Sequence, residues 1–522
     1  MTNANELEKE ASDRLKDARA QKAQFDTDLR EGYFFTAPQR SRDVSSKSSS
    51  KTRPTDAPEL QISIGIEVAQ DFTTELLNAF SPETSGWIDQ RAGIDISEDD
   101  ERENIEEDVG KQTKIILDAI KASSYYPAAA QAYMPDIALG TAALMIEDKR
   151  SYQPISCQAV PLRELEINIG PDGQIDDRFI VRKTKARNIP ALLGGLKLPE
   201  ETRRKIKDTP NHTSTIEWGW WRLWDRDEDV YWQAVVLVDK TLVHHAVLKG
   251  AGSCPLLVFR FNPDPMFAFG NGPTLLCLPE LRRLDETEAL KIENADFQIH
   301  PPFVFADDGV MNFSNGIEPG MGYPARPWGQ GRPIEKLSFE GNVNFAEFET
   351  MRVESRIRRL HFVDQPEQVG KTPPTAEQWA DERNRAKRRI GTPGKMFFKE
   401  GPTEVFLRFK WLLEKRGTIE PVTVDGRTIA LVPYDPTEQA QEYQEVQVAA
   451  QVLQMNQQYF AQTGEVQVDG LATMKNIKGK LRDTIVVFRD QAGMQGAMDM
   501  LAPLLGGGGM PPDPSAAGGM PV

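Results

Sequence analysis

The chain is poor in cysteine and histidine. Its 522 residues include three cysteines and five histidines. Cys157, Cys254 and Cys277 lie far apart and show no CxxC spacing. An odd number of isolated cysteines fits neither a disulfide framework nor a zinc knuckle, and it favours a reducing compartment. The histidines show no HExxH spacing, so we expect no zinc chemistry and, more generally, no metal and no cofactor.

Basic charge and long apolar runs are also scarce. The chain has 62 Lys and Arg against 78 Asp and Glu, a formal net charge of −16. Sequence-reading DNA binders neutralise phosphates with clustered Lys and Arg, so this balance argues against that class. No stretch approaches the roughly 18 apolar residues of a membrane span, and residues 1–30 do not resemble a signal peptide. With 39% hydrophobic and 27% charged residues, we expect a soluble globular protein of two or three domains.

Periodicity predicts helices in the first part of the chain. A charged helix over 3–34 has apolar positions too sparse for a continuous stripe, so we expect it to be solvated or to contact another protomer. These positions are Leu7, Leu15, Phe25 and Leu29. A Ser-, Lys- and Pro-rich linker follows over 40–58. Further helices are predicted over 62–80, 97–123 and 128–139, and Pro135 should break the last of these.

Alternating patterns predict strands in the middle of the chain. Residues 142–146 read as a buried strand, and the strands between 156 and 183 turn at Pro171-Asp172-Gly173. The remaining strands, separated by short polar turns, are predicted over 215–224, 230–238 and 241–248. Short turns join neighbouring strands in opposite directions, so this region should form an antiparallel meander.

The second half of the chain is mostly helical. Gly270-Asn271-Gly272-Pro273 precedes a long helix that begins at Thr274 or near Leu278 and ends near Gln298. Residues 303–339 are rich in Gly, Pro and aromatics and show no helical period. Further helices are predicted over 344–362, 375–390, 403–416, 437–462 and 481–501. A hairpin over 422–432 should turn at Asp425-Gly426, and residues 503–522 should be disordered.

None of the tempting catalytic patterns meets its chemical requirements. Val369-Gly370-Lys371-Thr372 resembles the end of a phosphate-binding P-loop, but Gln365 stands where that loop needs glycine. His244 and His245 should point to opposite faces of a strand, so they cannot bind one metal together. The basic cluster around Arg388 and the tryptophans of the meander suggest subunit or core contacts more than DNA binding. We expect no enzyme and assign no catalytic residue.

Several short strings, taken in order, resemble the head-to-tail connecting (portal) proteins of short-tailed, podovirus-type bacteriophages. Residues 79–90 resemble the family's helix, Phe-Pro turn and Trp, and residues 123–145 resemble its paired helices before a strand. Residues 269–273 (FGNGP) resemble the entry into the family's first stem helix, although Phe269 stands where the family usually has Tyr. Residues 300–309 (HPPFVFADDG) resemble its Pro-Pro-Leu string. The order matches from about residue 5 to 500.

The resemblance implies an α+β portal fold with wing, long-helix stem, small mixed clip and α-helical crown, assembled as a ring that we expect to be a dodecamer. The implied parts are a wing over 1–270 and 375–432, stem helices over 271–298 and 344–363, a clip over 299–343, a tunnel loop over 364–374, a crown over 433–502 and a disordered tail over 503–522. Such a ring occupies one capsid vertex and passes double-stranded DNA without sequence specificity during packaging and ejection.

The resemblance also implies partners and candidate site residues. In the tunnel loop, Gln368, Lys371 and Thr372 would face DNA, whereas the clip would offer terminase and tail adaptors Asn315, Tyr323, Arg326 and Trp328. Other implied partners are the major capsid protein, the scaffold, the terminase large subunit and tail nozzle proteins, with assembly in the host cytoplasm, a place in the virion and no membrane. Three alternatives stay open: a nucleotide-dependent DNA translocase, another capsid or scaffolding protein, and a monomeric enzyme.

Overall fold

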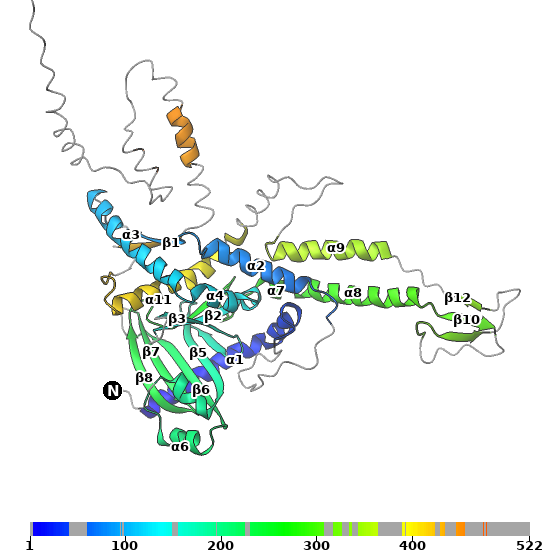
Figure 1. Cartoon of the computed structure of the whole chain (residues 1–522), viewed down its shortest axis with the longest axis horizontal. Helices are drawn as coiled ribbons and strands as arrows, with labels where there is room; N and C mark the ends of the chain where they lie inside the picture. Colours follow the sequence, from blue (N-terminus) through cyan, green and yellow to red (C-terminus); the bar gives the residue numbers. More distant parts are fainter. Residues whose placement is uncertain are drawn as a thin grey trace, which may run out of the picture. The chain divides into compact units, whose positions relative to one another are not determined.

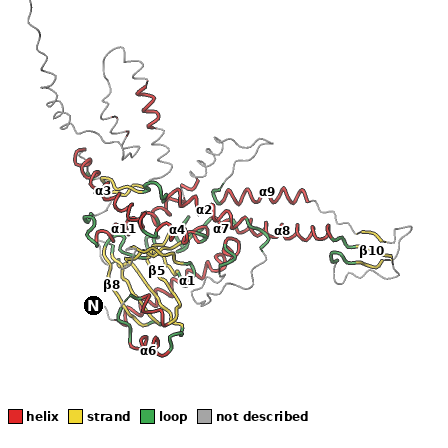
Figure 2. Tube along the Cα trace, viewed as in Figure 1, coloured by secondary structure: helices red, strands yellow, loops and turns green. Residues whose placement is uncertain are grey.

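A computed structural model describes most of the chain. The described residues are 4–40, 60–93, 95–96, 99–148, 155–194, 196–224, 230–306, 317–325, 334–336, 343–363, 389–391, 393–422, 429–433, 445–454, 473 and 477. The chain divides into two compact units, 1–437 and 438–522. The first unit mixes helices and sheets, as an α+β fold requires (Figure 1, Figure 2).

A five-stranded antiparallel sheet is the largest sheet of the first unit. Its strands run in the order β4-β5-β6-β7-β8, so each pairs with its neighbour in sequence and the predicted meander is confirmed. The bounds are Leu165–Ile169, Ile175–Lys185, Thr213–Leu223, Tyr231–Val238 and Thr241–Lys249. The predicted turn at Gly173 has a φ of 73°, a conformation that glycine adopts without strain.

Helix α1 (Ala4–Thr36) covers one face of this sheet. The buried positions Leu7, Ala11, Leu15 and Ala18 recur every three or four residues and contact side chains that include Trp221. The expectation of a solvated or interprotomer helix is therefore wrong, because the two alanines complete an apolar stripe that the larger residues alone do not form. The helix does need a partner surface, as its sequence indicates, and that surface is the chain's own sheet.

A second sheet packs against the other face. Its strands β3 (Ile155–Val160), β2 (Thr141–Asp148) and β9 (Leu256–Arg260) are antiparallel, with β2 in the centre. Buried side chains from both sheets, among them Leu165, Trp232 and Leu256, form one cluster. The predicted strand over 142–146 therefore lies at the centre of the layered core.

Helices cover the outer side of the three-stranded sheet. They are α2 (Ile64–Phe80), α3 (Asp99–Ala122), α4 (Tyr125–Tyr133) and α11 (Pro402–Lys415), and their apolar side chains share a large core with those of β9. The predicted break at Pro135 is confirmed, because α4 ends at Tyr133 and the short helix η1 (Asp136–Leu139) follows it. Short helical segments, η2 (Ala186–Asn188), α5 (Ile189–Leu192) and α6 (Glu200–Asp208), join β5 to β6.

The strand expected in a hairpin near Asp425-Gly426 pairs elsewhere. Strand β13 (Ile429–Pro433) lies antiparallel to β1 (Ile88–Ala92), with Leu431 opposite Gln90. The expected turn falls on residues 423–428, outside the described residues. Long-range pairing of this kind leaves no local sequence signal, because each strand carries only its own alternation.

The string FGNGP links the body to a pair of long helices. Gly140 has a φ of 110°, and a Cβ on it would clash with the backbone of Gly270 and Gly272. Helix α7 (Pro273–Leu276) begins one residue before the first alternative start, Thr274, and the long helix α8 (Leu278–Ile299) begins at the second, Leu278. The glycines are needed here because two backbone segments touch without room for side chains.

Helix α9 (Val343–Leu360) lies beside α8, and ion pairs join the two (Figure 1). Between the two helices in sequence lie three short strands, β10 (Phe303–Ala306), β11 (Gly322–Ala325) and β12 (Ile334–Lys336). Strand β10 is central, parallel to β11 and antiparallel to β12. The sequence shows no helical period over 303–339, and the elements described in this range are strands.

In the second unit, residues 445–454 are helical and lie within the predicted helix 437–462. The helix predicted over 481–501, the tail 503–522, the linker residues 41–58 and most of the helix predicted over 375–390 fall outside the described residues. No described helix is both long and apolar enough to cross a membrane.

Candidate functional site

The helix pair α8–α9 has a hydrophobic core only near the body. On α8, the buried apolar residues are Leu278, Leu281 and Leu284, all in its first two turns. On α9, Val353 and Ile357 are buried, in the half that returns to the body. Further out, polar contacts hold the helices together: Arg283 to Glu349 at 2.9 Å and Thr350 to Glu288 at 3.2 Å.

The outer part of the pair exposes large apolar side chains to solvent. Leu290 on α8 is 60% exposed, and Phe348 and Met351 on α9 are 64% and 67% exposed. Ile292 and Ile299 are also more than half exposed. Several large apolar side chains exposed on neighbouring helices are typical of a protein interaction surface and unusual for the free surface of a monomer.

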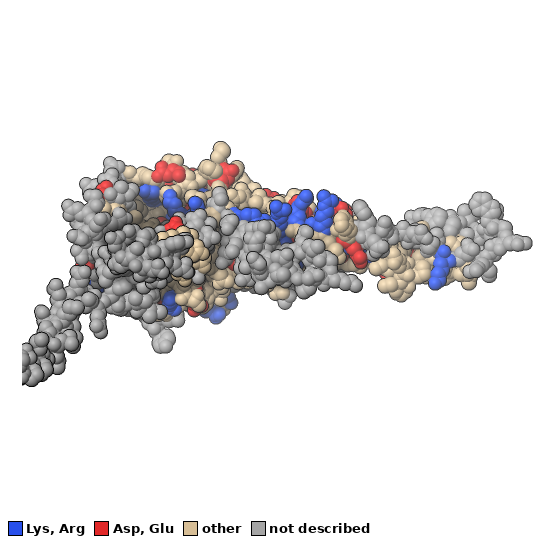
Figure 3. Space-filling view, turned by 90° about the horizontal axis from the view of Figure 1, so that it is seen from above, with Lys and Arg blue, Asp and Glu red and all other residues tan. Residues whose placement is uncertain are grey.

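Arginines form a stripe along α9. Arg352, Arg356 and Arg359 follow one another at intervals of four and three residues, so they share one helix face. Figure 3 shows basic side chains gathered along the helix pair. Glu280 on α8 neutralises part of this charge through an ion pair with Arg356 at 3.6 Å. The arginine stripe thus places positive charge on one face of α9, although the helix pair as a whole has more acidic than basic residues.

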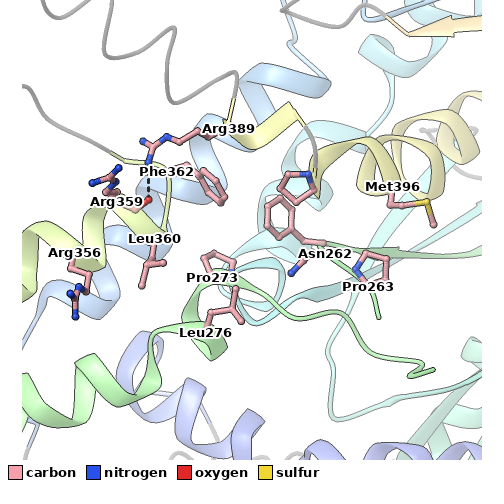
Figure 4. A pocket seen from close by; sticks show the side chains of 12 residues that line it. Asn262, Pro263, Pro273, Leu276, Arg356, Arg359, Leu360, Phe362, Arg389 and Met396 are labelled. Carbon is pink, nitrogen blue, oxygen red and sulfur yellow. Dashed lines mark hydrogen bonds between the residues drawn. The ribbon is translucent and has the colours of Figure 1, made fainter. Parts of the chain in front are cut away.

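A pocket of about 540 Å³ lies where α9 meets the body (Figure 4). Leu276, Leu360 and Phe362 give it apolar walls, and Arg359 and Arg389 stand at its edge. Arg389 donates a hydrogen bond to the carbonyl oxygen of Arg359 at 3.5 Å and lies over the Phe362 ring. Desolvation, followed by repulsion from Arg359, lowers the pKa of Arg389.

Both ends of the segment 364–388 meet at this pocket. Val363 closes the turn after α9 through a hydrogen bond from its N–H to the carbonyl oxygen of Arg358. Arg389, the first described residue after the segment, contacts Phe362 and Arg359. The expected DNA-facing residues Gln368, Lys371 and Thr372 lie in this segment, outside the described residues, as do all other members of the predicted basic cluster.

A buried histidine fixes the base of the helix pair. Nδ1 of His361 lies 2.9 Å from the carbonyl oxygen of Ile357, which can only accept, so Nδ1 carries the proton. Nε2 therefore accepts from the Thr274 hydroxyl on α7, at 3.1 Å. Burial lowers the pKa of His361 to about 4, so it is neutral at pH 7 and ties the end of α9 to the short helix α7 that precedes α8.

The Cys277–His361 contact is not a catalytic dyad. Sγ of Cys277 lies 3.9 Å from Nδ1 of His361, and both side chains are buried. Burial raises the pKa of the Cys277 thiol to about 12, so the thiolate that a nucleophile requires does not form. Within the described part of the chain, no three His, Cys, Asp or Glu side chains converge on a possible metal site.

Of the four residues expected at a docking surface on the β10–β12 sheet, the structure describes Tyr323. It lies on β11, half-buried, and its hydroxyl accepts a hydrogen bond from the Glu318 N–H at 2.7 Å. Asn315, Arg326 and Trp328 lie outside the described residues. Two large apolar side chains are exposed here as well, Met321 just before β11 and Ile334 on β12.

Sequence reasoning missed the arginine stripe of α9, the exposed apolar residues and His361. The spacing of Arg352, Arg356 and Arg359 was a usable signal, because residues four and three apart share a helix face. The exposure of Phe348 and Leu290 had no such signal, since an apolar residue on a helix is normally assigned to the core.

Comparisons with known proteins identify the family. A model of the bacteriophage head to tail connecting protein family matches residues 8–484. Among solved structures, a chain titled "Virion of native gene transfer agent (GTA) particle" matches with a TM-score of 0.35 and 12% identity, covering 79% of this chain and 89% of that chain. Comparison with curated protein sequences finds no match. Because the family model spans most of its length, the chain belongs to the bacteriophage head-to-tail connecting proteins.

Proposed function

We propose that this protein forms the portal ring of a bacteriophage capsid, a dodecamer at one vertex through which double-stranded DNA is packaged and ejected. In this proposal α8 and α9 form the stem around the channel, and residues 299–343 form the clip that docks the terminase and tail adaptor proteins. Residues 364–374 form the tunnel loop, residues 1–270 and 375–432 form the wing, and residues 433–502 form the crown. The protein acts mechanically and not as an enzyme.

One observation carries the ring proposal: the outer helix pair exposes apolar side chains that the described part of the chain leaves uncovered. Leu290, Phe348 and Met351 are each at least 60% exposed. Full burial of one such side chain contributes about 1.5–3 kcal/mol, so covering three of them at each subunit boundary would stabilise a ring by several kcal/mol per boundary. A closed ring covers these surfaces on every copy, because each subunit supplies both sides of the contact.

The charge distribution suits a channel through which DNA moves. A net charge of −16 on each chain repels DNA from most of the surface, and the arginines of α9 supply limited positive charge on the helix pair. Tight phosphate binding would hold the duplex in place, since each neutralised phosphate adds to the affinity. A few cations on an acidic protein instead favour contact without sequence preference and without strong retention.

Mass photometry and negative-stain microscopy of the purified chain test the proposal. A dodecamer of the 58.5 kDa chain has a mass of about 700 kDa and should appear as a closed ring with a central hole. The double variant Leu290→Asp with Phe348→Asp should remain folded and monomeric, whereas Val247→Asp, at an exposed position on β8, should still form rings. A wild-type chain that stays at 58.5 kDa at all concentrations would refute the ring and the channel.

A further inference from the structure

We infer that, in this ring, α9 of each subunit packs against α8 of the next, with Phe348 on Leu290 and Arg352 paired with Glu286. The inference rests on the proposed ring and names the contact that closes it. All four side chains are exposed in the single chain. In this inference the occupant of the surface is a second copy of the same chain, because the faces of α8 and α9 are complementary in charge.

Each helix presents an apolar and a charged residue together. Glu286 and Leu290 are four residues apart on α8, and Phe348 and Arg352 are four residues apart on α9. Residues four apart lie on the same face of a helix, about one turn from each other. The two faces therefore carry the same pattern at the same spacing, with opposite charges.

The contacts within one chain set the heights of these residues along the helix pair. The short Thr350 side chain of α9 donates to Glu288 of α8 at 3.2 Å, which places these two residues at about the same height, whereas the longer arginine side chains reach along the pair from Arg356 to Glu280 and from Arg283 to Glu349. Because the helices are antiparallel, Arg352, two residues after Thr350, lies at the height of Glu286, two residues before Glu288. By the same reasoning Phe348, two residues before Thr350, lies at the height of Leu290.

Ring symmetry carries this alignment to the next subunit. Copies in a closed ring are related by rotation about one axis, and a rotation leaves heights along that axis unchanged. With the helices running along the axis, α8 of the next copy presents Glu286 at the height of Arg352 and Leu290 at the height of Phe348. Because the residues are spaced by four on both antiparallel helices, the register that aligns Phe348 with Leu290 also aligns Arg352 with Glu286.

The local charges favour the same pairing. Glu349 receives two arginines of its own chain, Arg283 at 2.9 Å and Arg352 at 3.6 Å, so one carboxylate is shared by two cations. Among the residues that the structure describes, Glu286 has no ion-pair partner. A neighbouring Glu286 would supply the missing negative charge beside Arg352, and burial behind Phe348 and Leu290 would strengthen the attraction.

Charge reversal tests the pairing in the full-length chain. Glu286→Arg and Arg352→Glu should each place like charges at every boundary and raise the concentration for half-assembly by about tenfold or more. Combining both variants should restore assembly to within about threefold of wild type. Glu201→Arg, at an exposed position on α6, is the matched control and should assemble like wild type.

Disulfide trapping gives an independent readout. In a chain with Leu290→Cys and Phe348→Cys, a copper–phenanthroline oxidant should remove two electrons and two protons from each thiol pair and form a bond between copies, visible as a ladder on a non-reducing gel. Either cysteine alone should give no ladder, since the three native cysteines are buried. Wild-type rings with no ladder and no rescue would overturn this contact and leave the ring intact, whereas the absence of wild-type rings would refute the proposed function itself.

Discussion

His361 should make the stability of the first unit dependent on pH. Its ring is buried between α9 and α7, donates to the carbonyl oxygen of Ile357 and accepts from the Thr274 hydroxyl. Desolvation is the main reason why its pKa falls from 6.5 to about 4, and the hydrogen bond to Ile357 opposes that fall. Protonation would turn Nε2 into a second donor facing a hydroxyl that must then reorient, inside a site closed to water.

Whether acid stabilises or destabilises the protein depends on which state, folded or unfolded, binds the proton of His361 at the higher pH. As pH falls through 6.5, the unfolded chain takes up a proton on this histidine while the folded chain does not. The contribution of neutral His361 to stability is therefore fully present above about pH 6.5 and is lost as pH falls towards 4. Below that value this contribution changes no further. A pKa difference of this size corresponds to about 3 kcal/mol of unfolding free energy.

Chemical denaturation of wild type and His361→Asn between pH 7.5 and 4 measures this term. The stability difference between the two proteins should shrink by about 3 kcal/mol over that range, because asparagine does not titrate. Asp136, whose pKa burial raises to about 6, pulls the pH dependence the other way, but it is present in both proteins and cancels. The control His245→Asn changes an exposed histidine. If the difference between wild type and His361→Asn stays constant with pH, His361 is not a buried neutral base.

Three further substitutions test buried contacts of the body. Lys22→Met leaves three carbonyl oxygens without their donor and the buried Glu166 without its cation 3.6 Å away, so denaturant unfolding should show a loss of about 3–5 kcal/mol; an unchanged midpoint would contradict this. Gly140→Ala should sharply lower the melting temperature, whereas Gly173→Ala, with open space around it, should cost about 1 kcal/mol; equal effects would refute the backbone contact. Arg408→Met leaves three carbonyl oxygens without their donor, so limited proteolysis near α11 should accelerate, and wild-type rates would count against that role.

The sequence was sufficient wherever local patterns decide structure. The alternation over 215–248 and its short polar turns predicted the antiparallel meander, because side chains on a strand alternate between faces. The break at Pro135 and the long helices before and after residues 303–339 were also predictable, since proline and helical period act locally. The strings that resemble head-to-tail connecting proteins led to the correct family, which the family model confirms.

The candidate site was predictable only in outline. The order of two long helices around a short non-helical segment located the helix pair and the β10–β12 sheet. The importance of Phe348 and Leu290 was hidden, because their sequence context is that of ordinary core residues and only their exposure distinguishes them. The DNA-facing role of Gln368, Lys371 and Thr372 and the docking roles of Asn315, Tyr323, Arg326 and Trp328 remain predictions.

Composition and local pattern by themselves determined the class of this protein: an acidic chain of mixed helix and sheet, without a recognisable catalytic motif, whose ordered strings match a connector family. Tertiary structure alone decided the partners of each element. It placed α1 on the chain's own sheet, paired β13 with β1, buried His361 against Thr274 and left the outer faces of α8 and α9 uncovered. The physical reason is that periodicity records which face of an element is apolar, whereas the surface that covers that face is set by contacts between residues far apart in the chain.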